Sequence, residues 1–221
     1  MFLGKSFPCL VLCLLVLLSL SCRQVSFPSG TKLSGNDPAS PFLLQNQFGS
    51  DKSLYDYAGK VVVLTFLYTS CSDICPVVAR HLRTTYEVLK NKDTEFNIVV
   101  ISVDPKRDSV ERVYEYSKRW SMLNKWDFLT GEEQLLLPIW TAYYVSEPEK
   151  IGYGQEELLE GAINGAQKGG TGIFRDKIAE QYSVSHSSPV YVIDSEGYLR
   201  MVFTLPFDPD DLIKYVESIM D

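Results

Sequence analysis

Two cysteines stand four positions apart in the stretch YTSCSDICP, residues 68–76, immediately before Pro76. A thiolate is both the nucleophile of disulfide exchange and a ligand for soft metal ions, so the pair indicates one of these two chemistries. A disulfide brings its β-carbons to about 3.8 Å, whereas residues four apart on a helix hold theirs at about 5–6 Å. The spacing therefore favours a metal ion shared by Cys71 and Cys75, and a disulfide would need a loop conformation at Cys71.

Pro76 predicts where the two thiols lie. Proline disfavours helical geometry in the residue before it and suits the first turn of a helix, so we expect a helix to begin near Cys75. Cys71 then lies on the loop that leaves the preceding strand, and Cys75 lies at or near the helix cap. The partial positive charge of a helix N-terminus stabilises ionised sulfur, which both chemistries require.

A third metal ligand has to come from a distant part of the chain, which contains two histidines. His81 lies within a predicted helix, where we expect it to be packed or solvated. His186 lies in YSVSHSSPVYVID, on the loop that feeds a core strand, and the fold expected below brings this loop opposite the cysteines. His186 is therefore the candidate for the third ligand.

Two acids near these motifs are further candidates. Asp73 lies between the cysteines, where it either orients His186, docks a partner, or acts only as an acid at a helix N-terminus. Asp104 precedes Pro105 and is expected to shape a turn after its strand. The four methionines are too scattered to form a second soft-metal site.

The elements that must position these residues alternate between strand and helix from about residue 42 onward. Two apolar runs, typical of strands buried on both faces, flank an amphipathic helix and form a β-α-β unit: residues 60–68 and 97–104 around 76–92. The later elements are a helix capped by Ser109, a short strand over 126–131, a helix over 132–145 interrupted at Pro138, an antiparallel hairpin turning at Glu196 and Gly197, and a last helix capped by Asp208. This order predicts the α/β class and a thioredoxin-like fold, with a central mixed sheet flanked by helices. Ligands of such sheets bind beyond the carboxyl ends of the strands, where the cysteines lie.

A glycine-rich segment interrupts this pattern before the last hairpin. Residues 152–172 hold seven of the chain's 14 glycines, which is too many for an ordinary helix, so we expect a long mobile insertion. A phosphate-binding loop is excluded, because no lysine stands between Gly170 and Thr171 and no strand leads into the segment.

The N-terminus has a different character from the rest of the chain. Lys5 is followed by an apolar run that ends in LSLSC, which predicts a signal peptide of the bacterial lipoprotein type over 1–22, with a lipid on Cys22. An uncleaved anchor helix is the alternative. Residues 23–40, rich in Ser, Gly, Pro and Asn, predict a flexible tether, and the folded domain is expected over 41–221. Either alternative places the domain in the cell envelope, held by the membrane on its extracytoplasmic side.

Composition limits the remaining possibilities. A length of 221 residues with 45% hydrophobic residues is enough for one sizeable core, so we expect one domain. The formal net charge of −7 excludes a nucleic-acid surface, which needs clustered Lys and Arg. Of the five cysteines, Cys9, Cys13 and Cys22 belong to the predicted signal. Only Cys71 and Cys75 then remain in the domain, and a disulfide across so short a loop would stabilise it little.

Three segments, FLYTSCSDICP, ISVDPKRDS and YSVSHSSPVYVIDSEG, resemble the Sco/SenC copper chaperones in order and spacing, and the similarity runs from about residue 42 to the end. Those proteins assist assembly of the copper A centre in subunit II of cytochrome c oxidase. The resemblance implies that Cys71, Cys75 and His186 bind copper, with thiolates suited to Cu(I) and the imidazole helping to hold Cu(II). It also implies a copper donor protein, and as acceptor subunit II or another cuproprotein. Ser72 stands where the family usually has Pro, and Leu67 where it usually has Gly, but neither removes a ligand.

The leading functional hypothesis is a non-enzymatic carrier that passes copper on by ligand exchange. The alternative is a thiol-disulfide oxidoreductase that keeps the cysteines of an acceptor reduced, with Cys71 and Cys75 as its redox pair. A thiol peroxidase ranks last, because those enzymes carry Thr three residues before the reactive Cys and this chain has Tyr68 there. Zinc would suit the same three ligands, so the choice of copper comes from the resemblance alone.

Overall fold

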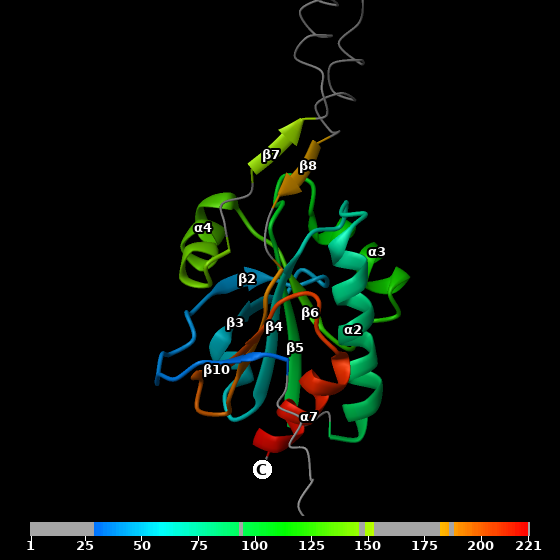
Figure 1. Ribbon diagram of the computed structural model, residues 1–221. Coiled ribbons are helices and arrows are strands. Elements are labelled where there is room, and N and C mark those ends of the chain that lie inside the picture. Colours follow the sequence, from blue (N-terminus) through cyan, green and yellow to red (C-terminus); the bar gives the residue numbers. More distant parts are fainter. Residues whose placement is uncertain (1–28, 93–94, 146–148, 153–181, 186–187, 221) are drawn as a thin grey trace, which may run out of the picture.

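The structure is a computed structural model that describes residues 29–92, 95–145, 149–152, 182–185 and 188–220. The predicted signal peptide, most of the glycine-rich insertion and His186 lie outside the described residues. The described part is a mixed six-stranded sheet flanked by helices (Figure 1), which confirms the predicted α/β class and thioredoxin-like fold. Within these ranges, no helix combines the length and the apolar character needed to cross a membrane.

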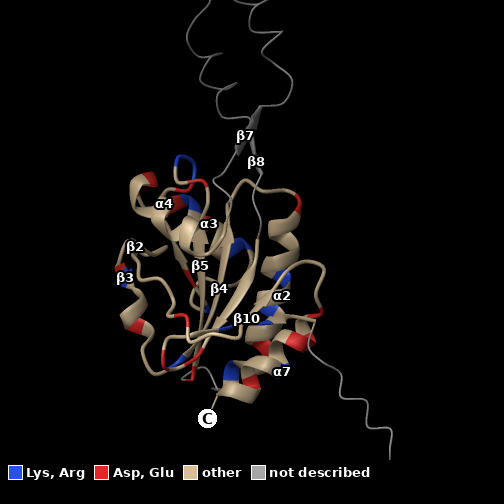
Figure 2. Cartoon of the chain, turned by 60° about the vertical axis from the view of Figure 1, so that its left-hand side comes forward, with Lys and Arg blue, Asp and Glu red and all other residues tan. Residues whose placement is uncertain are grey.

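The sheet places the strand that precedes the cysteines near its centre. In spatial order its strands are β1 (Thr31–Lys32), β10 (Leu199–Phe203), β9 (Val190–Ile193), β4 (Val61–Leu67), β5 (Phe96–Ser102) and β6 (Asp127–Leu129). The β4, β5 and β6 strands are parallel to one another, and the remaining pairs are antiparallel. All seven residues of β4 are buried, and neither β4 nor β5 carries a charged side chain (Figure 2). The continuous apolar run therefore forms a strand covered on both faces, as its sequence predicts.

Helices cover both faces of this sheet. In both ribbon views α2 (Ile74–Leu89) and α7 (Pro209–Ile219) lie together on one side, and α4 (Glu133–Ala142) lies on the other (Figures 1 and 2). The fourth helix, α3 (Val110–Arg119), follows β5 and contacts β6. The smaller elements are two hairpins and two short 3-10 helices: β2 (Leu43–Gln45) with β3 (Asp51–Ser53), β7 (Glu149–Gly152) with β8 (Tyr182–Ser185), η1 (Leu54–Tyr57) and η2 (Lys90–Lys92).

Local capping explains where several elements start. The Ser109 side chain accepts a hydrogen bond from the Arg112 amide at 3.3 Å, and the Asp208 carboxylate accepts one from the Asp210 amide at 2.9 Å, so both predicted caps are confirmed. The hairpin of β9 and β10 turns at Gly197, whose φ of +89° favours glycine.

The predicted interruption at Pro138 is wrong. The α4 helix continues through this residue, although proline cannot donate the usual backbone hydrogen bond. Leu136, Ile139 and Trp140 are buried on both sides of the proline and hold the helix against the core, so tertiary packing outweighs the lost bond.

The folded part begins earlier than the predicted boundary at residue 41. Within the segment predicted as a tether, β1 pairs with β10, Pro38 forms a bridge to Tyr198, and Ala39 is buried. Both residues of β1 are exposed, so this edge strand shows no apolar alternation from which it could be predicted.

Candidate metal centre

The two cysteines lie at the carboxyl end of β4, as predicted. Cys71 is on the loop that leaves the strand, and Cys75 is the second residue of α2, which begins one residue earlier than Pro76 indicates. Proline fits the third helical position because the first four amides of a helix need no intrahelical acceptor. The Asp73 side chain makes no capping hydrogen bond, and the Cys75 amide instead points to the Cys71 sulfur, 3.4 Å away. The sulfur of Cys71 thus takes the role of a helix cap.

Neither thiol forms a disulfide, and the two residues are buried to different degrees. Cys75 is completely buried, whereas Cys71 retains 9% of its surface. Both sulfurs therefore belong to one buried local structure, and Cys71 is the less deeply buried of the two residues.

The two thiols also differ in acidity. Hydrogen bonding from the Cys75 thiol lowers the pKa of Cys71 to about 6, helped by the backbone amides of Cys75 and Asp73 and opposed by burial. Burial raises the pKa of Cys75 far above its ordinary value, and the neighbouring Cys71 sulfur raises it further. At neutral pH the pair therefore consists of a thiolate at Cys71 and a thiol at Cys75, the thiolate being the stronger metal ligand and nucleophile.

Among the described residues, no three His, Cys, Asp or Glu side chains are grouped closely enough to hold a metal ion. The described residues nearest in sequence to His186 are Ser185, the last residue of β8, and Ser188. Pro189 follows, and its carbonyl accepts a hydrogen bond from the Thr65 hydroxyl at 2.9 Å. The β9 strand is paired with β4, with Val190 opposite Thr65. Pro189 and Val190 are thus fixed beside Thr65, near the carboxyl end of the strand that leads to the cysteines.

The other polar residues singled out in the sequence have structural surroundings. His81 is a packed helix residue, as predicted, with its ring edge-on to Phe207 at 4.9 Å between centroids. Asp104 shapes a turn, because its carbonyl accepts the amides of Arg107 and Asp108. Asp73 is exposed at the start of α2, and no described contact joins it to a metal ligand other than through its backbone amide.

Sequence reasoning did not single out Asp108, although it lies in the quoted segment ISVDPKRDS. The structure places its carboxylate in the core beneath the cysteine loop, where it accepts hydrogen bonds from Thr69 and Ser102. An acid immediately before a predicted helix cap is ordinary in a loop, so only the fold reveals its burial.

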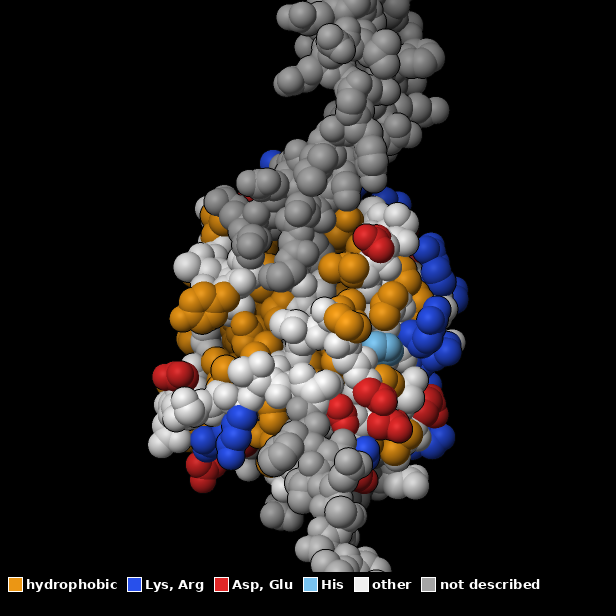
Figure 3. Space-filling model, viewed as in Figure 1, with side chains coloured by type: hydrophobic (Ala, Val, Ile, Leu, Met, Phe, Trp, Pro, Cys, Tyr) orange, Lys and Arg blue, Asp and Glu red, His pale blue; other side chains and the backbone are white. Residues whose placement is uncertain are grey.

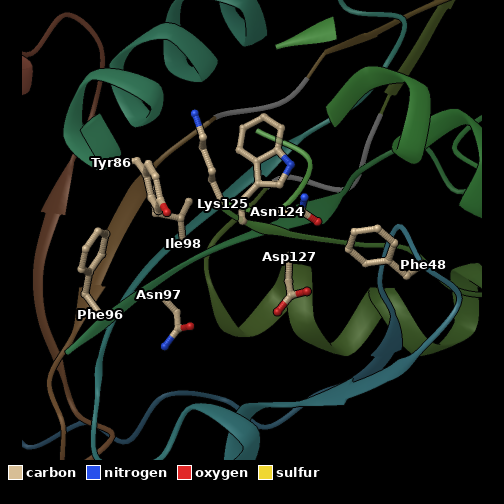
Figure 4. Close-up of a pocket in the computed structure, with 9 residues that line it drawn as sticks. Phe48, Tyr86, Phe96, Asn97, Ile98, Asn124, Lys125 and Asp127 are labelled. Atoms are coloured by element: carbon tan, nitrogen blue, oxygen red, sulfur yellow. The ribbon is translucent and has the colours of Figure 1, made fainter. Parts of the chain in front are cut away.

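Cavities are found at both ends of the parallel strands in the described part of the molecule. One of about 420 Å³ borders the cysteine loop and is lined by Thr69 and Ser70 together with residues of α3. The other, of about 290 Å³, surrounds the first residues of β5 and β6 and is lined by aromatic rings, amides, Lys125 and Asp127 (Figure 4). It contains no thiol or imidazole and is remote from the carboxyl end of β4, so it is not a candidate metal site.

The surface around α2 combines charge with apolar groups. On the face shown in Figure 3, Lys and Arg side chains gather along the edge formed by α2, and hydrophobic side chains lie across the middle. Val77, two residues after Cys75, keeps 37% of its surface exposed. The helix that begins at the cysteines thus presents an exposed apolar side chain in its first turn.

Comparisons with known proteins agree with this fold. A family model described as SCO1/SenC matches residues 31–158. A SCO1 protein homolog of Bacillus subtilis (strain 168) is 33% identical over 188 residues, which are 83% of this chain and 83% of that protein. The structure of Arabidopsis thaliana ScoI with copper bound is 26% identical, with a TM-score of 0.63, covering 82% of this chain and 97% of that one. Apo Sco1 from Thermus thermophilus, 24% identical, shares the fold with a TM-score of 0.65 and covers 89% of this chain and 98% of its own.

Proposed function

The chain belongs to the SCO1/SenC family, and on that premise we propose that it is a copper chaperone, a non-enzymatic carrier that takes up copper and passes it on by ligand exchange. The single observation that carries the proposal is the pair of cysteines without a disulfide at the carboxyl end of β4, one on the loop after the strand and one in the first turn of α2. A similar protein, Arabidopsis thaliana ScoI, has been solved with copper bound.

The donor set fits this cargo. Thiolates select Cu(I), and the Cys71 thiol, with a pKa of about 6, is already ionised at neutral pH. Cys75 would lose its proton when copper binds, because a metal ion displaces the proton of a coordinating thiol. We assign the third ligand to His186, and the support is the β9 register, which holds Pro189 against Thr65.

The wider context of the function follows from the sequence. We propose that residues 1–22 are a lipoprotein signal, that Cys22 carries the lipid, and that the domain is held in the cell envelope on the extracytoplasmic side. The β1 strand shortens the proposed tether to about residues 23–30. A copper donor protein would load the site, and subunit II of cytochrome c oxidase or another cuproprotein would receive the metal.

Anaerobic copper titration of the reduced chain from residue 23 onward tests the proposal. We expect one copper per chain with sub-micromolar affinity, and loss of binding in Cys71→Ser and in Cys75→Ser. When the bound copper is oxidised to Cu(II), the protein should show a thiolate to Cu(II) charge-transfer band, and His186→Ala should remove this band. His81→Ala is the matched control, because this histidine packs on Phe207, and it should leave the band unchanged. Copper binding that persists in both cysteine variants would exclude the carrier function.

A second function, thiol-disulfide exchange with an acceptor, is favoured by the contrasting acidities of the two thiols. The Cys71 thiolate would attack an acceptor disulfide, forming a mixed disulfide and releasing one acceptor thiolate. Deprotonated Cys75 would then attack the Cys71 sulfur and release the second, leaving the acceptor reduced and a Cys71–Cys75 disulfide. We expect this disulfide to equilibrate with a glutathione couple in a redox titration followed by mass spectrometry. A pair that stays reduced across the whole range of the couple would rule out this second function.

A further inference from the structure

We propose that Asp108 is a positioning residue that fixes the base of the cysteine loop, acting together with the Asp104–Arg107 pair. These three residues are called the brace below. The part of this inference that concerns copper rests on the proposed function, whereas the part that concerns the order of the loop stands without it.

The Asp108 carboxylate ties the loop to the sheet. It is completely buried, and its Oδ1 accepts hydrogen bonds from the Thr69 amide at 3.1 Å and the Thr69 hydroxyl at 2.6 Å. Its Oδ2 accepts one from the Ser102 hydroxyl at 2.6 Å. Thr69 stands two residues before Cys71, and Ser102 ends β5, so one side chain joins the cysteine loop to the neighbouring strand.

The backbone of Asp108 extends this connection to a third strand. Its carbonyl accepts a hydrogen bond from the hydroxyl of Thr130, the residue after β6. The carboxyl ends of β4, β5 and β6 are therefore all bonded to one residue. These are the three parallel strands beyond whose ends ligands of such sheets bind.

The rest of the brace holds the residue before Thr69. Arg107 pairs with the buried Asp104, and its guanidinium lies 5.7 Å from the centre of the Tyr68 ring. The Tyr68 carbonyl in turn accepts a hydrogen bond from the Cys71 amide at 3.3 Å. Two consecutive residues, Tyr68 and Thr69, are thus held from the 104–108 segment before the chain reaches the first sulfur.

Stability alone does not account for a carboxylate at this place. Taking a charged group out of water is costly, and well-packed apolar residues of similar volume often stabilise a fold as well or better. Two carboxylate oxygens with three directed hydrogen bonds supply what an apolar side chain cannot, a fixed direction for the chain at Thr69. The consequence is a Cys71 sulfur held where the Cys75 amide reaches it, before any metal is present.

Hydrogen–deuterium exchange of the metal-free chain, together with Cu(I) affinity, tests the positioning role. In Asp108→Ala we expect faster exchange at residues 69–75, unchanged exchange in α7, and about tenfold weaker Cu(I) binding, as for other residues that orient metal ligands. Asp108→Asn keeps an acceptor for Thr69 and should restore most of both readouts. Ser117→Ala is the matched control: Ser117 is completely buried, accepts the Trp126 indole N–H at 2.8 Å and donates to the Val113 carbonyl at 2.7 Å, and neither partner belongs to the cysteine loop.

Each outcome decides the inference. Exchange at residues 69–75 that equals the wild type, or that rises no more than in Ser117→Ala, would overturn it. If Asp108→Ala does not fold, Thr69→Val removes one of the three hydrogen bonds while keeping the amide, and the same local increase in exchange is then expected. A wild-type chain that binds no copper would refute the proposed carrier function, and the exchange measurement would still decide the role of Asp108.

Discussion

Cys71 and Cys75 carry the same side chain, yet their surroundings shift their acidities in opposite directions. Cys71 accepts hydrogen bonds from the start of a helix, whereas Cys75 lies within the first turn of that helix and is completely buried. The negative charge of the pair is therefore concentrated on the sulfur of Cys71, the less deeply buried of the two residues. This difference arises from the position of each residue relative to the helix start, and it gives the pair a defined nucleophile.

The acidity of Cys71 can be measured through its reaction with iodoacetamide. Because only the thiolate reacts, we expect the rate at Cys71 to reach half its plateau near pH 6, where its pKa lies. Cys75→Ala removes the hydrogen bond that contributes most to this lowering, so the midpoint should rise toward the ordinary range of a free thiol. The chain unfolded in urea serves as the reference. A native midpoint that coincides with this reference would contradict the assignment.

At the scale of elements, the long or capped segments were predictable and the short exposed ones were not. The β4 and β5 strands could be predicted from their apolar runs. The α3 and α7 helices could be predicted from their caps at Ser109 and Asp208. The two-residue β1 strand, exposed at both positions, offers no such pattern. The α4 helix shows the reverse case. Pro138 is unfavourable in a helix, but the helix continues through it because its buried neighbours pack against the core.

The same distinction applies to the candidate site. The adjacency of Cys71 and Cys75 follows from their spacing and from Pro76, so the sequence was sufficient for it. The hydrogen bonds between Thr69 and Asp108 join residues 39 positions apart and depend on the register of β4 and β5. Nothing in the composition of either segment specifies that register, which is why the role of Asp108 required the fold.

At the scale of the whole molecule, β1 covers an edge that the sheet would otherwise expose. It pairs with β10, and the segment that follows continues the contact through the bonds Leu33 amide to Arg200 carbonyl, Leu199 amide to Asp37 carbonyl, and Ala39 amide to Gly197 carbonyl. Uncovered edges are templates for pairing with a second chain. The N-terminal strand therefore replaces the five-residue β10 as the edge of the sheet with a strand of only two residues.

Two truncated chains test this contribution. A chain that starts at residue 41 loses the three backbone hydrogen bonds above together with the β1–β10 pairing, and at about 1 kcal/mol for each bond we expect its free energy of unfolding to fall by at least about 3 kcal/mol. It should also associate with itself in size-exclusion chromatography, since β10 becomes an open edge. A chain that starts at residue 29 keeps these bonds and is the control. Equal urea midpoints for the two chains would show that β1 contributes nothing.

The pairing of β4 with β9 has an evolutionary consequence. Thr65 and Pro189 are bonded across 124 positions of sequence, and their separation in space is set by hydrogen bonds between adjacent strands. Additions or losses of residues between β7 and β8 leave that register intact. Descendant sequences are thus free to lengthen, shorten or diversify this intervening stretch while the two strand ends stay together.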